Sequence, residues 1–335
     1  MKVVFASYNA CCQNASGGVQ NRLRKIASLV ADRGLDVELF DPFETKLEKG
    51  DILHVFMLSL DTFSLIQYAK SKGVKVVIST IVPLIGSKKL KVYKWLHVLP
   101  IVTTYKINRM SLNYADALIT ESQRESDFIG KYFGINTGKM NVIPNGVDVE
   151  KYTGAEIYEN IGGAEKYILQ VGRFDENKNQ INVIRALKNT NIPLVFIGGP
   201  GKGNEAYYEK CLKEAQGYSN IHFLGWVDSS SPIIKSAFAH ADTVIVPSFY
   251  ETFGLTAIEG GCMGAKIAFS NTLPITDYPV FSSCLKFAPD NVSQIRETIK
   301  QVYEQDKDGL FTENVISTFN WKSVIDEHIR IYNTI

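Results

Sequence analysis

Residues 243–264 read TVIVPSFYETFGLTAIEGGCMG and combine a strand, a loop and a helix. The continuous apolar run Thr243–Val246 predicts a buried parallel strand, and the residues from Leu255 onward favour a helix. Gly254 therefore lies where the loop turns into the helix, at the carboxyl end of a sheet. The first free backbone N–H groups of that helix favour a bound anion at this place.

Two glutamates flank this turn. Glu251 is in the predicted loop, and Glu259 is about one turn into the predicted helix. One carboxylate can accept hydrogen bonds from hydroxyls on one side of a bound phosphate, and the other from hydroxyls on the far side. This pattern suits a nucleotide sugar, in which a diphosphate joins a hexose to a ribose.

Similar apolar runs recur along the chain and fall into two series. Stretches of helical length separate most of them, which is the pattern of parallel sheets buried on both faces. The sequence therefore predicts an α/β fold with two Rossmann-like domains whose sheets face each other across a cleft. The first series is Val3–Ala6, Val37–Phe40, Ile52–Met57, Val74–Ser79 and Ala117–Thr120, and the second is Tyr167–Gly172, Pro193–Gly198, Ile221–Leu224, Thr243–Val246 and Lys266–Ser270.

A turn and a last helix set the domain boundaries. Pro144-Asn145-Gly146 forces a turn, because Asn and Gly tolerate positive φ and Pro prevents a helix from continuing. We place an N-terminal domain at residues 1–150 and a C-terminal domain at residues 151–318. Apolar residues at helical spacing from Trp321 to Tyr332 predict a packing helix within residues 319–335.

Composition describes an ordinary soluble globular chain. Its 335 residues are 45% apolar and 21% charged, and the length favours two domains. The net charge of +1 is unevenly placed, since residues 1–150 hold 19 Lys and Arg against 14 Asp and Glu. This mildly basic half indicates an anionic partner or a membrane surface. Duplex nucleic acid would need a far stronger basic patch.

Cysteine usage favours a cytoplasmic chain. The five cysteines are an odd number, and Cys11 and Cys12 are adjacent, a poor geometry for pairing. No CxxC or zinc-like Cys/His spacing occurs, so we interpret all five as reduced thiols. The apolar run at the N-terminus is too short for a signal peptide, and no stretch is long enough to cross a membrane.

Two cations follow the strand that opens the second domain. In YILQVGRFDENKNQ, residues 167–180, Arg173 leaves the strand and Lys178 comes five residues later. Both can converge on a diphosphate, where Arg gives bidentate contacts and Lys a mobile charge. Both would also oppose the charge that grows on a departing nucleoside diphosphate. In isolation, each cation is better explained as a solvated surface residue.

Glycines and an aromatic residue end other strands. The turn Ile197–Gly201 contains three glycines, which would keep a cleft open or simply form a turn. Trp226 and Val227 follow the next strand, and the indole is either a shelf for a nucleobase or, as the plainer interpretation, part of the core.

The first helix also begins at a pair of glycines. Gly17 and Gly18 let backbone approach a ligand closely, and the helix N-terminus behind them favours negative charge. Asp41 at the end of the second strand imitates the acidic residue of NAD-binding folds. No GxGxxG pattern follows the first strand, so the dinucleotide interpretation is the weaker one.

A basic, aromatic stretch covers residues 86–99, GSKKLKVYKWLHVL. Such a composition can lie on an anionic bilayer. The lysines scatter around a helical wheel, however, so a solvated loop and helix is the default. Peripheral contact with the inner face of a membrane through residues 86–99 is the alternative.

These pieces occur together, in order, in a known group of enzymes. Over nearly its whole length the chain resembles the retaining, family-4 type glycosyltransferases of the GT-B fold. Each motif alone is weak, but the ordered series is specific. It comprises Gly17-Gly18, ADALITES at 115–122, IPNGVD at 143–148, VGRFDENKN at 171–179, FLGWV at 223–227 and PSFYETFGLTAIE at 247–259.

The resemblance implies transfer of a sugar from a UDP- or GDP-sugar to a hydroxyl of a saccharide or lipid-linked saccharide, in polysaccharide or glycoconjugate synthesis. It implies retention of anomeric configuration, no metal and no cofactor besides the donor, and a last helix that packs back on the N-terminal domain. Arg173, Lys178 and Glu251 would act in catalysis. The implied donor-binding residues are Gly17, Gly18, Arg173, Lys178, Trp226, Val227, Glu251, Thr252, Phe253, Gly254, Leu255 and Glu259.

Two departures from the family pattern stand out. Many relatives have a His after the fourth strand of the first domain, where this chain reads ISTIVP at 78–83, which implies a different sugar pocket. Relatives also follow the second Glu with helix formers, whereas this chain has Gly260-Gly261, at about 1 kcal/mol per glycine in a helix interior. Either another segment packs closely there or the helix is short.

No side chain stands out as a covalent nucleophile, so we expect a front-face reaction in which a donor phosphate oxygen takes the proton of the acceptor hydroxyl. The rival enzymes on this fold are a nucleotide-sugar epimerase and a phosphorylase, and neither's characteristic residues are evident. A non-catalytic nucleotide-sugar-binding protein and an exported two-lobed solute-binding protein are the rivals from other classes.

Overall fold

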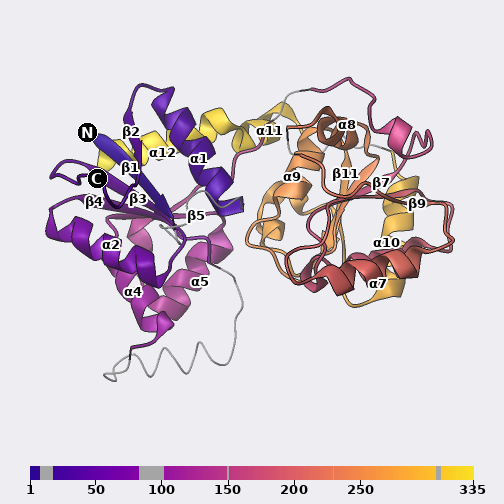
Figure 1. Cartoon of the computed structure of the whole chain (residues 1–335), viewed down its shortest axis with the longest axis horizontal. Coiled ribbons are helices and arrows are strands. Elements are labelled where there is room, and N and C mark those ends of the chain that lie inside the picture. The colour runs from indigo at the N-terminus through magenta and orange to yellow at the C-terminus, as the bar shows by residue number, and fades with distance from the viewer. Residues whose placement is uncertain (8–17, 83–101, 149–150, 229, 307–310) are drawn as a thin grey trace. The chain divides into compact units, whose positions relative to one another are not determined.

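The computed structural model describes residues 1–7, 18–82, 102–148, 151–228, 230–306 and 311–335. The chain forms two compact units (Figure 1). The first consists of Met1–Asn145 and Trp321–Ile335, and the second of Gly146–Asn320. Each unit is an α/β layer structure with its own parallel sheet.

The first unit contains a six-stranded sheet in the order β2-β1-β3-β4-β5-β6, and every pairing in it is parallel. This order places the carboxyl ends of all six strands along one edge. Five of the strands correspond to the predicted apolar runs, while β6 was not predicted, since its three residues MNV carry little apolar signal. The strands are β1 (Lys2–Ser7), β2 (Asp36–Leu39), β3 (Ile52–Phe56), β4 (Lys75–Ser79), β5 (Ala117–Thr120) and β6 (Met140–Val142).

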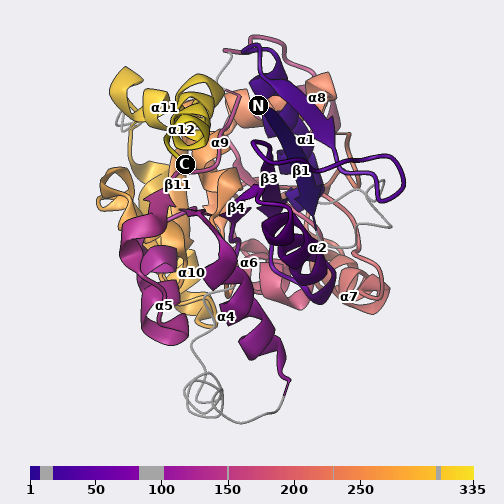
Figure 2. The same cartoon turned by 90° about the vertical axis from the view of Figure 1, so that its left-hand side faces the viewer.

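Successive residues of these strands point to opposite faces, and helices cover both. Val3 and Phe5 of β1 face α1 (Gly18–Ala31) and α12 (Trp321–Thr334). Val4 and Ala6 face the other helix layer, which consists of α2 (Leu60–Ser71), α4 (Thr104–Tyr114) and α5 (Gln123–Phe133). Figure 2 shows α4 and α5 side by side in that layer. The predicted last helix therefore forms, and it buries its apolar stripe against the first sheet.

The second unit repeats the plan with the sheet order β12-β11-β10-β7-β8-β9, again fully parallel. Four of its strands are buried along nearly their whole length, as their mostly apolar runs predict. The short edge strand β12 was not predicted. The strands are β7 (Ile168–Val171), β8 (Leu194–Ile197), β9 (Ile221–Phe223), β10 (Thr243–Val246), β11 (Lys266–Ser270) and β12 (Leu285–Phe287).

Helices again cover both faces of this sheet. Leu169 and Val244 face α8 (Pro232–His240) and α9 (Leu255–Cys262). Ile168 and Ile245 face the opposite layer. That layer consists of α6 (Gln180–Leu187), α7 (Glu205–Ala215) and α10 (Val292–Glu304). A short α11 (Glu313–Phe319) precedes the return to the first unit.

The Gly260-Gly261 pair has two explanations in the structure. Helix α9 is short, with eight residues. A Cβ at position 260 would lie 2.5 Å from Cγ2 of Val244, and one at 261 would lie 2.2 Å from the ring of Phe311. Both glycines therefore let α9 sit directly on strand β10 and on the Phe311 ring, and the close neighbours are side chains.

Candidate functional site

A pocket of about 300 Å³ lies in the second unit, at the carboxyl ends of β7 and β8. We call it the β7–β8 pocket. Gly172 and Gly198 directly follow the two strands and line it, and Glu259 of α9 contributes a carboxylate. Its walls also include Trp226 and Val227, which follow β9. Three predicted donor-binding residues thus line one cavity, at the edge where α/β sheets bind ligands.

The floor of the β7–β8 pocket is bare backbone. Gly198 has φ +137°, and a Cβ there would lie 2.1 Å from the carbonyl oxygen of Gly172. The amide of Gly198 donates to the carbonyl of Gly225, and that of Gly172 to the carbonyl of Ile197. Position 198, in the turn after β8, must therefore be glycine, because any side chain there would collide with the carbonyl of Gly172 at the end of the neighbouring strand.

The expectation that Trp226 packs in the core is wrong. The residue is 64% exposed, although its indole lines the β7–β8 pocket. A Cβ at Gly199 would lie 2.5 Å from the indole, so this glycine lets the ring lie directly against the turn. An exposed indole over a pocket is available to stack on a flat ligand, which favours the alternative role of shelf.

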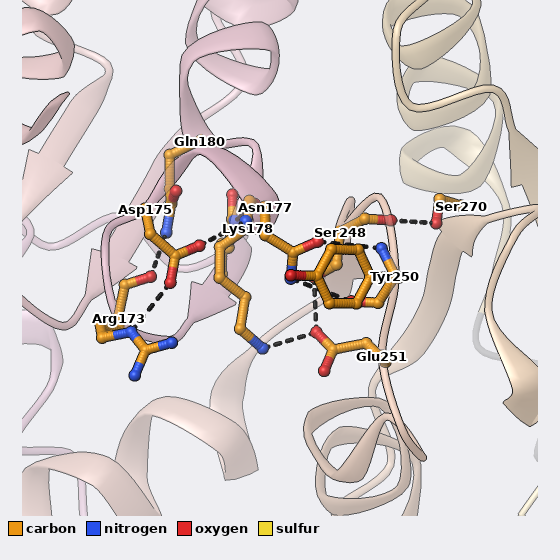
Figure 3. A network of polar contacts seen from close by, with 10 residues as sticks. Arg173, Asp175, Asn177, Lys178, Gln180, Ser248, Tyr250, Glu251 and Ser270 are labelled. Carbon is orange, nitrogen blue, oxygen red and sulfur yellow. Dashed lines mark hydrogen bonds and ion pairs between the residues drawn. The ribbon is translucent and has the colours of Figure 1, made fainter. Parts of the chain in front are cut away.

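The predicted cation and carboxylate form a direct pair (Figure 3). Nζ of Lys178 lies 2.6 Å from Oε1 of Glu251, and both side chains are largely buried. The hydroxyl of Ser248 donates to the same oxygen at 2.6 Å, and Ser270 donates to the carbonyl of Ser248. Residues 73 positions apart are thus joined at the carboxyl ends of β7 and β10.

Arg173 lies beside this pair. Its Nε donates to Oδ2 of Asp175 at 2.9 Å, while Oδ1 of Asp175 accepts from the backbone N–H of Lys178. As Figure 3 shows, the terminal nitrogens of the guanidinium point away from Asp175. The Arg173 side chain is 59% exposed and lies across Gly201, where a Cβ would be 2.4 Å from its Cδ. Asp175 therefore orients the Arg173 guanidinium and fixes the backbone at Lys178, whose ammonium is held by Glu251.

Asparagines fasten the loop after β7 to the loop after β10. Nδ2 of Asn177 donates to the carbonyl of Tyr250, and the amide of Tyr250 donates back to Oδ1 of Asn177 (Figure 3). Asn179 has φ +60°, is 1% exposed and donates to the carbonyls of Pro247 and Pro289. Asparagine tolerates this left-handed conformation at low cost. These hydrogen bonds therefore fix the loop after β7, which contains Arg173 and Lys178, to the loop after β10, which contains Glu251.

The ion-pair network adjoins the β7–β8 pocket through Gly172. The Lys178 side chain passes 3.8 Å from the position a Cβ of Gly172 would occupy, and Gly172 lines the pocket. A ligand that fills the pocket near Gly172 therefore reaches the Lys178 stem. The structure brings together Arg173, Lys178 and Glu251 in one cluster and Trp226, Val227 and Glu259 in the adjoining pocket.

Glu259 has an unusual protonation equilibrium. Burial, reinforced by the nearby Asp148 carboxylate, raises the pKa of Glu259 from 4.5 to about 7. Burial and Glu259 together raise the pKa of Cys262 to about 12, so this thiol is not a thiolate at neutral pH. Hydroxyl donors on a ligand would stabilise the ionised form of Glu259, because they replace the hydration that burial removes.

The turn into α9 has the predicted form. Gly254 caps the helix with φ +106°, and Leu255 is its first residue. Phe253 is 2% exposed and packs edge-on against Tyr278, so its ring is a core anchor and its backbone alone can face a ligand. Thr252 and Leu255 are half-buried. The amide of Ala257 donates to the carbonyl of Gly254, whereas the amides of Leu255 and Thr256, the first two of α9, have no acceptor within the helix, as at any helix start.

Several predictions concern the first unit. Gly18 is the first residue of α1, whereas Gly17 and the basic stretch 86–99 lie outside the described residues.

At the position of the family's His, the Thr80 hydroxyl donates to Oε1 of Glu125, as does the amide of Val82. Burial and the neighbouring Glu121 raise the pKa of Glu125 to about 7. The buried carboxyl of Glu125, which was not predicted from the sequence, thus binds the segment after β4 through two hydrogen bonds.

Several residues of the β7–β8 pocket were not predicted from the sequence. Asp148 lies within the IPNGVD motif, so its place there could have been inferred from the motif. Lys151, Tyr152 and Lys235 gave no signal, because isolated polar residues in a loop and on a helix look like solvated surface.

The described residues contain no group of three or more His, Cys, Asp or Glu side chains arranged to hold a metal ion. Within the same residues, no helix has both the length and the apolar character needed to cross a bilayer.

Comparison with protein families gives two matches that together cover most of the chain. Residues 43–151 match the model described as Glycosyltransferase Family 4, and residues 158–311 match the model described as Glycosyl transferases group 1. The first match lies mainly in the first unit, and the second lies within the second unit.

Individual relatives are distant. The chain is 25% identical over 228 residues to a glycogen synthase of Mycobacterium tuberculosis, covering 65% of this chain and 54% of that protein. It is 27% identical over 249 residues to the Escherichia coli UDP-Gal:alpha-D-GlcNAc-diphosphoundecaprenol alpha-1,3-galactosyltransferase, covering 68% and 59%. The aligned region therefore spans little more than half the length of these curated relatives.

Solved structures share the fold across the whole chain. Sucrose-phosphate synthase from Thermosynechococcus elongatus superposes with a TM-score of 0.78 at 18% identity, covering 99% of this chain and 98% of that one. The Anabaena protein HepE in complex with UDP and glucose gives 0.74 at 16% identity, covering both chains fully. The two parallel sheets, the ordered motifs and the family matches agree, and the chain belongs to the family-4 type glycosyltransferases of the GT-B fold.

Proposed function

We propose that this protein is a retaining glycosyltransferase that transfers a sugar from a UDP- or GDP-sugar to a hydroxyl of a saccharide or lipid-linked saccharide. The observation that carries the proposal is the Lys178–Glu251 pair, with Arg173 beside it, next to a pocket that contains Glu259. A nucleotide sugar needs this combination of cations for its diphosphate and carboxylates for hydroxyls on both sides.

Arg173 and Lys178 would bind the diphosphate. Asp175 fixes the guanidinium of Arg173, and Glu251 holds the ammonium of Lys178, so the cations are oriented before a donor binds. Charge grows on the diphosphate as the glycosidic bond breaks, and oriented cations stabilise that state more than the ground state. The opening amides of α9, next to Gly254, supply further donors for negative charge.

The two glutamates would bind hydroxyls. Glu251 would contact the donor sugar, since the loop bond to Ser248 and the pair with Lys178 hold it beside the cations. Glu259, inside the β7–β8 pocket, would accept hydrogen bonds from the ribose, with Trp226 and Val227 beside the base.

In the proposed reaction, the oxygen of an acceptor hydroxyl bonds to the anomeric carbon while the bond from that carbon to the diphosphate breaks. The hydroxyl proton passes to a phosphate oxygen of the leaving group. Acceptor and leaving group occupy the same face of the sugar, so the configuration is retained. We assign no covalent nucleophile and no metal ion, because Arg173 and Lys178 provide the charge that opposes the leaving diphosphate.

The biological setting that fits this chemistry is synthesis of a polysaccharide or glycoconjugate at the cytoplasmic side of a membrane. Two relatives support the choice through their names. One is a glycogen synthase, and the other transfers galactose to a diphosphoundecaprenol-linked sugar. Structures related by fold hold UDP and UDP-glucose, which supports a nucleotide-sugar donor.

The proposal is tested by nucleotide binding followed by product analysis. UDP, GDP and their common sugars are screened by thermal shift, because a ligand bound at 100 times its Kd adds about 2.7 kcal/mol of stability. The best donor is then incubated with saccharide acceptors. Acceptor-dependent release of nucleoside diphosphate and a product with the donor's anomeric configuration, seen by NMR, are expected. An inverted product contradicts retention, an epimerised donor points to an epimerase, and binding without turnover points to a non-catalytic protein.

The raised pKa of Glu259 predicts pH-dependent donor binding. Ribose hydroxyls donate to the ionised carboxylate, so binding favours loss of the proton that Glu259 carries below pH about 7. Affinity for the preferred nucleotide sugar should therefore rise about tenfold from pH 6 to pH 8 and then level off. Calorimetry in buffers of different ionisation enthalpy should show proton release in this range. Glu259→Gln should bind more weakly and without this dependence, and an unchanged slope in the variant would assign the titration to another group.

A further inference from the structure

Two neighbouring strands of the first unit end in strained backbone. Ile81, two residues after β4, has φ +45°, and Met57, which directly follows β3, has φ +68°. In the part of the chain that the structure describes, the third non-glycine residue with positive φ is Asn179, beside the cations of the second unit. Asparagine tolerates this conformation, whereas a β-branched isoleucine is a true outlier there. Such strain persists only where surrounding contacts impose it, and it concentrates at functional sites.

The contacts that hold the strained turn come from Glu125. Its Oε1 accepts from the Thr80 hydroxyl and from the Val82 amide, both at 2.7 Å, so the two bonds lie on either side of Ile81. Its Oε2 accepts from the amide of Glu121, also at 2.7 Å. Glu125 is 2% exposed. One buried carboxylate therefore brackets the strained residue, and both of its oxygens are occupied by donors from the chain itself.

Glu125 is itself firmly anchored. It lies in the first turn of α5, and its amide donates to the hydroxyl oxygen of the N-cap residue Ser122. The neighbouring Glu121 forms a buried ion pair with Arg22 of α1. The amide of Thr80 donates to the carbonyl of Ile119 in β5. Any movement of residues 80–82 would therefore disturb a buried network that joins β4, β5, α1 and α5.

A neutral group of the same shape cannot replace this carboxylate. Glutamine offers one oxygen and one NH₂ group, whereas the site presents backbone N–H donors to both positions. In Glu125→Gln, either the Val82 amide or the Glu121 amide would face another donor. A buried N–H group without an acceptor is unfavourable, so the turn would relax away from its strained conformation.

The turn after β4 lies at the carboxyl edge of a parallel sheet, where α/β folds carry out their chemistry. We propose that Glu125 is a positioning residue of the transfer reaction, which holds residues 80–82 in the strained conformation that turnover requires. It acts through the turn and does not touch a substrate, because it is buried and both oxygens are occupied. The inference rests on the proposed transferase function.

Steady-state kinetics of Glu125→Gln tests the proposal. The variant should lower kcat by about tenfold or more, because a displacement of about 1 Å can cost up to about 10²-fold in rate. The thermal shift produced by the preferred nucleotide sugar should stay as in the unaltered chain, since the β7–β8 pocket belongs to the second unit. Rates are compared at about pH 8, where Glu125 of the unaltered chain is ionised, because its pKa is about 7.

Variants of Thr80 keep the proposal testable should Glu125→Gln fail to fold. Thr80→Val removes the hydroxyl donor at nearly constant shape and should lower kcat, whereas Thr80→Ser keeps a hydroxyl and should retain it. Where Glu125→Gln folds, the double variant with Thr80→Val should lose less than the product of the two single losses, because both changes act through one turn.

Asp116→Asn is the matched control. Oδ2 of Asp116 accepts from the amide of Val76 and from Nζ of Lys70, both at 2.8 Å, so this carboxylate holds the amino end of β4 as Glu125 holds the segment after its carboxyl end. Its substitution should lower the unfolding temperature but leave kcat within about twofold, because it lies at the edge of the sheet away from the chemistry. Circular dichroism and thermal unfolding follow the fold of every variant.

The outcomes separate this inference from the proposed function. If the unaltered chain transfers no sugar, the proposed function fails and this inference fails with it. If the unaltered chain is active, the inference alone is overturned by a folded Glu125→Gln with kcat within about twofold. It is equally overturned if Asp116→Asn loses as much turnover as Glu125→Gln, or if Thr80→Val and Thr80→Ser have the same kcat.

Discussion

Arg173→Ala is expected to lower kcat by about a hundredfold or more, with a smaller change in the KM for the donor. The guanidinium would oppose charge that develops on the departing diphosphate, and loss of one such donor typically costs 10²–10³ in kcat. The fold should tolerate the change, since the Arg173 side chain is 59% exposed and Asp175 keeps its bond from the backbone N–H of Lys178. Steady-state kinetics with the preferred nucleotide sugar measures the effect.

Arg185→Ala is the matched control for this change. Arg185 lies on α6 of the same unit, is 40% exposed and pairs with Glu214 at 3.2 Å, but it lies outside the proposed site. It should keep turnover within about twofold, as expected for an exposed ion pair. Near-normal turnover in Arg173→Ala, with circular dichroism unchanged in both variants, would remove Arg173 from the diphosphate site.

Gly198→Ala is expected to destabilise the second unit by about 3 kcal/mol or more. An alanine there must adopt φ +137° and place its Cβ 2.1 Å from the carbonyl oxygen of Gly172. Left-handed strain and overpacking each cost about 1–3 kcal/mol. The Gly172 strand end would have to move, so nucleotide binding should weaken together with stability.

Gly203→Ala isolates the conformational part of this effect. Gly203 has φ +82°, but a Cβ there has open space around it. Its substitution should cost only about 1 kcal/mol. Denaturant unfolding of both variants, followed with and without the preferred nucleotide, separates strain from collision. Equal losses in the two variants would show that the close approach of Gly172 and Gly198 does not matter.

The long apolar strands and the order of motifs were accessible from sequence. Thr243–Val246 and Lys266–Ser270 form strands with the predicted bounds, because a mostly apolar run of this length is suited to a parallel sheet buried on both faces. Strands β6 and β12 were missed. Each has three residues at a sheet edge, where pairing to one neighbour imposes little on composition.

The site was only partly accessible. Arg173 and Lys178 stand out because cations directly follow a predicted strand, and strand ends are fixed by topology. The partners of these residues could not be inferred. The two bonds of Asn177 to Tyr250, and the pairing of Lys178 with Glu251, depend on how two loops meet in space. The position of Trp226 was predicted wrongly because a large apolar side chain suggests burial. In the structure Trp226 is 64% exposed, and Gly199 leaves room for its ring beside the turn.

The bonds of Asn177 and Asn179 to the loop after β10 have a consequence for engineering. Asn177 and Asn179 bond main-chain atoms of Tyr250 and Pro247. A segment 247–255 transplanted alone from a relative, to change the sugar that is accepted, therefore keeps these three hydrogen bonds only if its backbone follows the same path. The exchangeable module is therefore the pair of segments 172–180 and 247–255. A chimera that carries both should fold and bind nucleotide better than a chimera that carries either one.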